Sequence, residues 1–272
     1  MKLKLQILLP LFLCIFVSGA NAQSDSSFQF LRSLKGDFIS FNVDNLENIY
    51  LLTNTNQLKK VNINGDSIGV FNDIKRFGIP TSIDVTNPLK ILLYYDKVST
   101  VVILDRILNV RNIIDFRKQN IFLVKTIAGS YDNNIWIFDE ADFKLKKIDE
   151  KGNQLMETTG WRILFDSVPS PAQLIDRNNY IYLYDPEKGF YIFDYYGGFK
   201  NRLAFLSWKN VDVSAKNIYG FRNNILYSCE ISTLNLKEYN LPSYIRDYKA
   251  IKAINGKLYL LKDTGVDIYI LK

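Results

Sequence analysis

One pattern recurs along the chain and limits what it can fold into: a turn containing asparagine, an apolar strand, a short polar turn and a second strand. Residues 132–155, DNNIWIFDEADFKLKKIDEKGNQL, carry this pattern, and related stretches begin near residues 44, 85, 176, 222 and 254. The first apolar anchors of the six copies are separated by 43, 43, 46, 45 and 32 residues; they are Ile49, Leu92, Ile135, Ile181, Leu226 and Leu258. A period near 43 with several strands per copy is typical of a β-propeller blade.

Each copy is expected to contain four strands. In the third copy these are Val124–Ser130, Ile135–Asp139, Lys144–Asp149 and Gln154–Thr158. The second strand is apolar on both faces, as it must be where blades stack and bury both sides. A helical solenoid would instead need long apolar faces with a period of 3.6 residues, and these runs are short and rich in β-branched residues.

The last copy has room for only three strands between Lys249 and Lys272. An incomplete blade would expose unpaired backbone groups at its edge. Phe28–Leu34 has strand character and precedes the first copy, so it is expected to supply the missing strand. The sequence therefore predicts an all-β fold: a six-bladed β-propeller of four-stranded antiparallel blades, with the ring closed by the N-terminal strand.

The N-terminus reads as a signal peptide. Met1–Lys4 is basic, Leu5–Val17 is almost wholly apolar, and Ala20-x-Ala22 is a small-x-small cleavage site. We expect residues 1–22 to be removed after Ala22, which leaves residues 23–272 as one propeller domain exported to the periplasm. Lipidation of Cys14 is the competing interpretation, but the preceding leucine stands where a small residue is required. No later apolar run is long enough to predict a membrane span.

Composition narrows the classes of function. The chain has 34 basic and 28 acidic residues, and removal of Lys2 and Lys4 with the signal peptide leaves 32 against 28. This mild balance, together with export, argues against a nucleic-acid partner. Loss of Cys14 leaves Cys229 alone, so the exported domain is expected to have no internal disulfide and to depend on its core.

The repeats resemble those of NHL-type six-bladed propellers, of the exported kind found in Gram-negative bacteria. The shared motif is D-x(2–3)-N-I-Y-L, then L-K-K-V/I, then N-G, and it is clearest at Asp44–Gly65 and Asp132–Gly152. The second copy lacks the glycine turn and the sixth is truncated. The resemblance covers about residues 28–272 and implies a fold, but it implies little about function.

No catalytic or cofactor motif is present, and no cofactor is predicted. The chain has no histidine, which removes histidine-based acid–base catalysis and histidine-ligated zinc. Six-bladed propellers related to gluconolactonases hold a divalent metal in the central channel with Glu, Asn and Asp. The innermost strands expected here, including Asn217–Phe221 in the fifth blade, offer only Asn42, Asp84, Gln173 and Asp176 and no glutamate. A metal site is therefore not predicted.

The links between blades carry a second pattern, in which an aromatic residue stands beside a cation. The candidate binding residues in these links are Arg76, Phe77, Arg117, Trp161, Arg162, Trp208, Lys209, Tyr244 and Arg246. All five links are expected on one face of the propeller. They could form a rim for a protein partner, a small anionic ligand or a glycan. Alternatively, the aromatic rings wedge between blades while the cations are merely solvated.

Two classes of function follow. The first is a non-catalytic binding or scaffold propeller that mediates protein–protein interaction in a bacterial envelope assembly, such as an outer-membrane secretion or assembly machine. Such a protein would reach the outer membrane through a partner. The alternative is a lactonase-like or sugar-processing hydrolase with a divalent metal in the channel. Clustered acidic side chains in the channel would favour the hydrolase, and an apolar or blocked channel would favour the scaffold.

Overall fold

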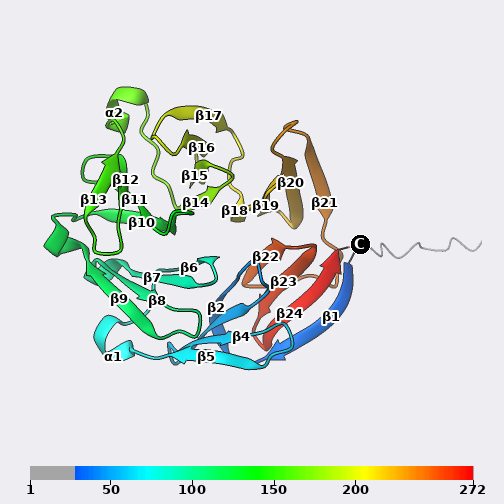
Figure 1. The fold of residues 1–272 in the computed structure, drawn as a ribbon. Coiled ribbons are helices and arrows are strands. Elements are labelled where there is room, and N and C mark those ends of the chain that lie inside the picture. The colour runs from blue at the N-terminus through cyan, green and yellow to red at the C-terminus, as the bar shows by residue number, and fades with distance from the viewer. Residues whose placement is uncertain (1–27, 272) are drawn as a thin grey trace, which may run out of the picture.

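The computed structural model describes residues 28–271, which form six four-stranded antiparallel sheets arranged around a central axis (Figure 1). This arrangement confirms the predicted six-bladed β-propeller. The predicted signal peptide and its cleavage after Ala22 lie outside the described residues. No helix within those residues is long and apolar enough to cross a membrane.

The first three blades follow one another along the chain. Blade 1 contains β2 (Phe38–Val43), β3 (Ile49–Thr53), β4 (Leu58–Val61) and β5 (Ser67–Phe71). Blade 2 contains β6 (Ser82–Asn87), β7 (Lys90–Tyr95), β8 (Thr100–Leu104) and β9 (Val110–Asp115). Blade 3 contains β10 (Val124–Gly129), β11 (Ile135–Asp139), β12 (Lys144–Ile148) and β13 (Gln154–Glu157), and these bounds agree with the predicted strands to within one residue.

The last three blades include the closing sheet. Blade 4 contains β14 (Gln173–Arg177), β15 (Tyr180–Asp185), β16 (Gly189–Asp194) and β17 (Phe199–Leu203). Blade 5 contains β18 (Lys209–Val213), β19 (Asn217–Arg222), β20 (Ile225–Glu230) and β21 (Leu236–Asn240). Blade 6 contains β22 (Ala250–Ile254), β23 (Lys257–Lys262), β24 (Gly265–Leu271) and β1 (Phe28–Lys35). Short helices occur in links and turns: α1 (Ile74–Phe77), η1 (Asp96–Val98), η2 (Phe116–Gln119) and α2 (Trp161–Leu164).

The strand β1 closes the ring, as predicted. It pairs with β24 from Phe28 opposite Leu271 to Lys35 opposite Gly265, so the first and last described strands lie side by side (Figure 1). Gly265 has a φ of +139°, and a Cβ atom there would lie 2.0 Å from the carbonyl oxygen of Leu34. Only glycine fits this close approach of two backbones.

The antiparallel order gives the propeller two distinct faces. Each link from an outermost strand to the next innermost strand lies on the same face as the turn between the second and third strands of a blade. We call this the link face. The remaining turns, such as those between β2 and β3 and between β4 and β5, lie on the opposite face, which we call the turn face.

The prediction for the fifth blade is wrong by one strand. Asn217–Phe221 was expected to be innermost, but it belongs to β19, the second strand, and β18 lines the axis instead. The anchor Leu226 consequently lies in the third strand, β20. The turn between β19 and β20 contains Asn223 and Asn224 with φ of 51° and 62°, so it mimics the asparagine-bearing turn that opens the other copies.

The core lies between adjacent blades. The second strands β3 and β11 are buried along their whole length, which explains why they are apolar on both faces. The second lysine of the L-K-K-V motif also serves a blade interface: Lys60 donates to the carbonyl of Arg106 in blade 2 at 2.9 Å. Burial lowers the pKa of Lys60, and the nearby Asp44 carboxylate partly offsets that effect.

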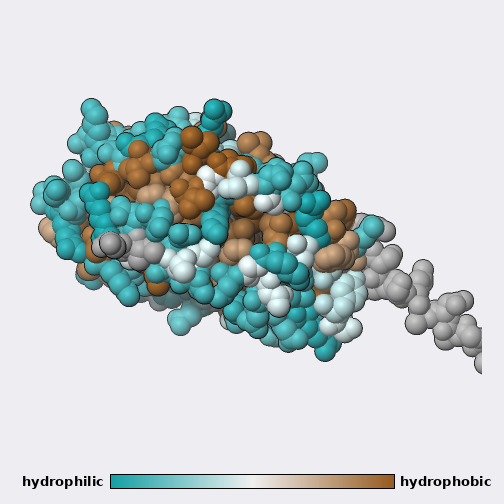
Figure 2. All heavy atoms as spheres, turned by 90° about the horizontal axis from the view of Figure 1, so that it is seen from below, coloured by the Kyte–Doolittle hydropathy of each residue, from teal (hydrophilic) through white to brown (hydrophobic). Residues whose placement is uncertain are grey.

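The outer wall carries exposed apolar side chains in small patches separated by hydrophilic ones, as the view of blades 6, 1 and 2 in Figure 2 shows. Phe30 on β1 and Val70 on β5 are exposed apolar side chains of outermost strands. Scattered exposure of this kind is normal for an outermost strand and does not by itself mark a site.

Candidate functional site

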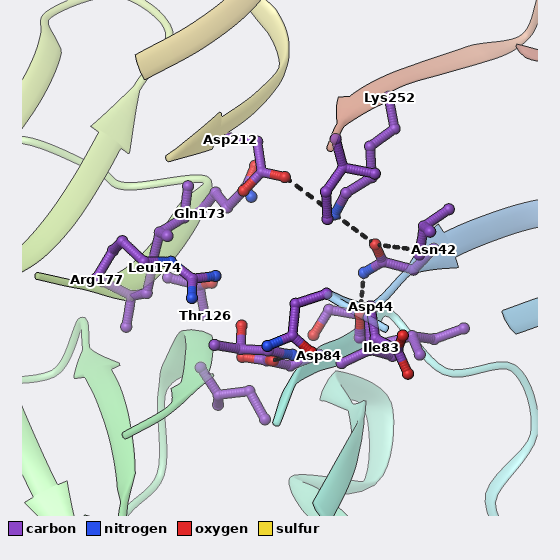
Figure 3. Close-up of a pocket in the computed structure, with 18 of the residues that line it drawn as sticks. Asn42, Asp44, Ile83, Asp84, Thr126, Gln173, Leu174, Arg177, Asp212 and Lys252 are labelled. Carbon is purple, nitrogen blue, oxygen red and sulfur yellow. Dashed lines mark hydrogen bonds and ion pairs between the residues drawn. The ribbon is translucent and has the colours of Figure 1, made fainter. Parts of the chain in front are cut away.

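The central channel holds a polar pocket of about 230 Å³, lined by the innermost strands of all the blades (Figure 3). Three of the four predicted channel residues line it: Asn42, Asp84 and Gln173. Asp212 and Lys252 also line it and were missed. Asp212 was missed because the fifth blade was assigned out of phase, so β18 was not recognised as an innermost strand.

Polar contacts in this pocket join four blades in series. The Nζ atom of Lys252 in blade 6 lies 3.2 Å from Oδ2 of Asp212 in blade 5. The same Nζ atom donates to Oδ1 of Asn42 in blade 1 at 2.6 Å. The amide of Asn42 then donates to the carbonyl of Ile83 in blade 2 at 2.7 Å, and Figure 3 shows this chain of contacts across the channel.

The other channel side chains make the same kind of contact. Asp84 in blade 2 accepts a hydrogen bond from the backbone N–H of Gly129 in blade 3 at 2.7 Å. Gln173 in blade 4 donates to the carbonyl of Val211 in blade 5 at 3.2 Å, and Arg177 donates to that of Val213 at 3.1 Å. The channel side chains are therefore largely engaged in fastening one blade to the next.

The fourth predicted channel residue, Asp176, does not line the channel pocket. Its buried carboxylate lies between blades 3 and 4, where it accepts hydrogen bonds from Ser130 Oγ and Trp136 Nε1 at 3.0 Å each and from the hydroxyl of Tyr195. Burial raises the pKa of Asp176, while these hydrogen bonds partly offset the increase. Asp176 thus joins blades 3 and 4 from inside their interface.

Between Phe28 and Leu271, no group of three or more carboxylate or thiol side chains is placed to hold a metal ion. The channel is also not an apolar plug. It is a narrow, mixed-charge pocket in which Asp84 and Asp212 have protein partners already. This chemistry suits cohesion of the ring better than polarisation of a substrate.

The two tryptophans of the links are buried wedges. Trp161 is 0% exposed and packs between Phe138 of blade 3 and Phe193 of blade 4, with ring centroids 4.6 and 5.2 Å away. Trp208 stacks on Phe205 at 4.3 Å and on Tyr227 of blade 5 at 5.2 Å. These rings match the structural alternative stated for the links, and they are not available on the surface to a partner.

The cations of the links are on the surface. Arg76 lies over Phe77 at 4.8 Å, Arg162 lies over Phe143 at 4.5 Å, and Arg117 donates to the carbonyl of Lys97 at 3.2 Å. Each guanidinium is thereby held against the link face. Phe77 itself is only partly exposed and packs on Tyr95.

The remaining predicted residues lie around blades 5 and 6. Lys209 and Arg246 are exposed on the link face beside one hollow. Tyr244 is half-exposed, and its hydroxyl donates to the carbonyl of Phe28 at 3.0 Å, so it fastens the link to the closing strand. The structure therefore brings Lys209 and Arg246 together and leaves Tyr244 at the blade boundary.

A set of exposed apolar side chains on the link face was missed. They occupy the start of β2 and four consecutive links from blade 1 to blade 5; we call them the link-face apolar set, and they are Ile39, Ile79, Phe122, Leu123, Ile163, Leu164 and Leu206. Ile163 is 81% exposed, Phe122 is 58% exposed and Ile79 is 56% exposed. The link sequences contain these residues, but only the packing of the neighbouring wedge shows which side of a link faces solvent.

The fold defines the class of this protein as a six-bladed β-propeller, and comparisons with known proteins agree with that class. No protein-family model matches the chain, and no curated protein matches it. Among solved structures, a streptogramin B lyase is 13% identical with a TM-score of 0.58 over 85% of this chain and 78% of that one.

Two further structures extend the comparison. The catalytically inactive histidine-to-alanine form of virginiamycin B lyase from Staphylococcus aureus, with quinupristin, is 10% identical with a TM-score of 0.58 over 90% of this chain and 88% of that one. The β-propeller domain of Cps50 (Swd1) from Myceliophteria thermophila is 8% identical with a TM-score of 0.61 over 90% of this chain and 100% of that one. At such identities the similarity shows the fold alone.

Proposed function

We propose that this chain is a non-catalytic binding propeller that docks a protein partner through its link face. The observation that carries the proposal is the link-face apolar set. Apolar side chains gathered on one face are typical of interaction sites, because each would gain the free energy of burial when it is covered. A partner that covered them would recover that free energy.

The charges around this set suit a protein more than a lipid surface. The cations Arg76, Arg117 and Arg162 are interspersed with exposed carboxylates on the same face, namely Asp96, Asp142 and Asp166. Anionic membranes favour surfaces of one positive sign. Apolar side chains surrounded by arginines and mixed polar groups are typical of protein–protein interfaces.

The alternative of a lactonase-like or sugar-processing hydrolase has less support. A metal-dependent reaction in the channel would need free carboxylates, but Asp84 and Asp212 are bonded to neighbouring blades. The structurally similar virginiamycin B lyase is inactive when a histidine is replaced by alanine, and this chain has no histidine. The likeness to that enzyme therefore does not extend to this catalytic side chain.

The N-terminal sequence supports an exported location for this function. A basic start, an apolar run and the Ala20-x-Ala22 site are typical of a secretory signal peptide. The partner we propose is accordingly a protein of the bacterial envelope, such as a subunit of an outer-membrane secretion or assembly machine. The chain itself would be periplasmic and would associate with the outer membrane through that partner.

The experiment is crosslinking followed by affinity purification from envelopes of cells that express tagged variants. The link-face variant combines Phe122→Asp with Ile163→Asp. A matched control combines Leu46→Asp with Leu89→Asp, because these turn-face side chains are 65% and 61% exposed. We expect the link-face variant to lose its crosslinked partner, with a cost of about 2 kcal/mol or more for an anchor, and the control to keep it.

Two outcomes would contradict the proposal. One is loss of the partner from the turn-face control with retention by the link-face variant. The other is retention by both variants. Thermal melts of all three proteins show whether a variant is folded before its partners are compared, because exposed substitutions usually change stability by only about 0.5 kcal/mol.

A further inference from the structure

The hollow between blades 5 and 6 on the link face is lined mainly by positively charged side chains. It has a volume of about 960 Å³ and is formed by the start of β18, the turn between β19 and β20, and the link that enters β22. Four cations line it, Lys209, Arg222, Arg246 and Lys249, against one carboxylate, Asp247. Its size is within the range of about 300 to 1,000 Å³ typical of ligand pockets.

Three of these cations have no acidic partner among residues 28–271. Lys249 pairs with Asp263 at 2.7 Å. None of the ion pairs found in the described part of the chain includes Lys209, Arg222 or Arg246. Three such cations around one hollow, with Asp247 as its lining carboxylate, create a local positive potential.

Arg222 is held in place before any ligand arrives. One terminal nitrogen of its guanidinium donates to the carbonyl of Leu206 at 3.3 Å, and the other donates to the hydroxyl of Tyr227 at 3.4 Å. The guanidinium also lies over the Tyr227 ring at 5.3 Å. A guanidinium has five N–H donors, so this one keeps donors for a carboxylate while little side-chain entropy remains to be lost.

The other lining groups favour a peptide over a free inorganic anion. Asn210 and Asn223 bring amide groups to the hollow, and amides pair well with a peptide backbone. Leu206, a member of the link-face apolar set, directly precedes the lining residue Ser207, and its backbone carbonyl accepts a hydrogen bond from Arg222. A ligand that filled this site would therefore combine carboxylates with apolar side chains.

We infer that the hollow between blades 5 and 6 binds an acidic peptide segment, with Lys209, Arg222 and Arg246 contacting its carboxylates. The inference rests on the proposed function, because it assigns this segment to the partner that covers the link-face apolar set. Carboxylate–guanidinium pairs are short, directional and often bidentate, so they would fix the orientation in which the partner docks.

The test uses a fluorescently labelled peptide of glutamates interrupted by leucines, and a second peptide in which glutamine replaces every glutamate. Fluorescence anisotropy with the whole domain should show binding of the acidic peptide alone. The double variant Arg222→Gln with Arg246→Gln should weaken that binding at least about tenfold. A control of equal charge change, Arg106→Gln with Lys151→Gln, lies on the turn face and should leave affinity within about twofold.

Several outcomes would overturn the inference: no binding of the acidic peptide at low salt, equal weakening by both double variants, or displacement of the peptide by inorganic phosphate at the same concentration. Lys209→Gln gives a second test if the arginine variants unfold, since no side-chain hydrogen bond or ion pair found among residues 28–271 involves Lys209. Retention of the envelope partner by Phe122→Asp with Ile163→Asp would instead refute the proposed function, whatever the peptide does.

Discussion

The Oδ2 atom of Asp84 in blade 2 accepts a hydrogen bond from the backbone N–H of Gly129 in blade 3 at 2.7 Å. Its Oδ1 atom accepts a second bond from the N–H of Thr86 at 2.7 Å. Asp84 is one of the two carboxylates that the sequence offered as channel candidates, and both of its oxygens are thus occupied by backbone donors. The channel of this propeller is therefore lined by side chains that bond one blade to the next.

The Asp84→Ala variant should lose stability. It leaves the partly buried N–H of Gly129 without its partner, which costs about 1 kcal/mol, the lower end of the range for a buried donor. Urea unfolding followed by circular dichroism measures the change, and the exposed Asp166→Ala is the control, expected within about 0.5 kcal/mol of the wild type. Unchanged unfolding of Asp84→Ala, together with loss of a calcium-stimulated lactone hydrolysis, would revive the hydrolase alternative.

The short helix α2 offers a contrast between two neighbouring side chains. Trp161→Ala should cost about 3–5 kcal/mol because it leaves a cavity between blades 3 and 4. Ile163→Ala, two residues later on the exposed side, should change stability by less than about 0.5 kcal/mol. Thermal and urea denaturation of the two variants compare them directly. Similar destabilisation by both would mean that the link packs in a different way.

Ring closure can be tested at one glycine. Gly265→Val should destabilise the whole domain by more than about 3 kcal/mol, because a side chain there meets the backbone of β1 and separates it from β24. Gly256→Ala is the control: it also has a positive φ, but no atom lies within 4 Å of its Cβ position. It should cost only about 1 kcal/mol of backbone strain. Equal effects would indicate that β1 contributes little.

A pH-dependent contribution is expected from Asp194. The hydrogen bond from Lys200 and the N–H groups of Tyr196 and Gly198 hold the pKa of Asp194 below its usual range. A lowered pKa in the folded state stabilises the fold above the unfolded value of about 3.9, and this contribution is lost as pH falls through the folded value. The difference in unfolding free energy between the wild type and Asp194→Asn should therefore be full at neutral pH and vanish in acid.

A variant of Lys200, the ion-pair partner of Asp194, tests whether this ion pair causes the pH dependence. Lys200→Gln removes the first donor to Asp194, so it should reduce the same pH dependence, and the double variant should add little more. Simple additivity of the two variants across the pH range would show that the ion pair is not responsible.

The six-bladed ring could be predicted from the sequence because each feature of the repeat constrains the backbone of its own segment. Apolar second strands, asparagine turns and the need to complete the last blade each constrain the backbone directly. The fifth blade shows the limit of this approach. Asn223 and Asn224 indicate a turn with positive φ. Asparagine alone does not show between which two strands of a blade that turn lies.

The binding surface was harder to predict, since it depends on packing between distant segments. A link such as Trp161–Leu164 contains several apolar residues in succession, and which of them enters the blade interface depends on the space between Phe138 and Phe193. Trp161, one of the candidate binding residues, is the side chain that fills that space. Arg222 was overlooked because it directly follows Asn217–Phe221, which was expected to be the innermost strand of the fifth blade.

The pairing of β1 with β24 also sets the order of events during synthesis. The first strand to emerge must wait for the last one, and until then five blades and part of a sixth form an open arc with both lateral edges unpaired. Contacts between such distant segments carry a large loop-closure entropy and slow the final step. A nascent chain of this design stays incompletely folded until its final strand has been made.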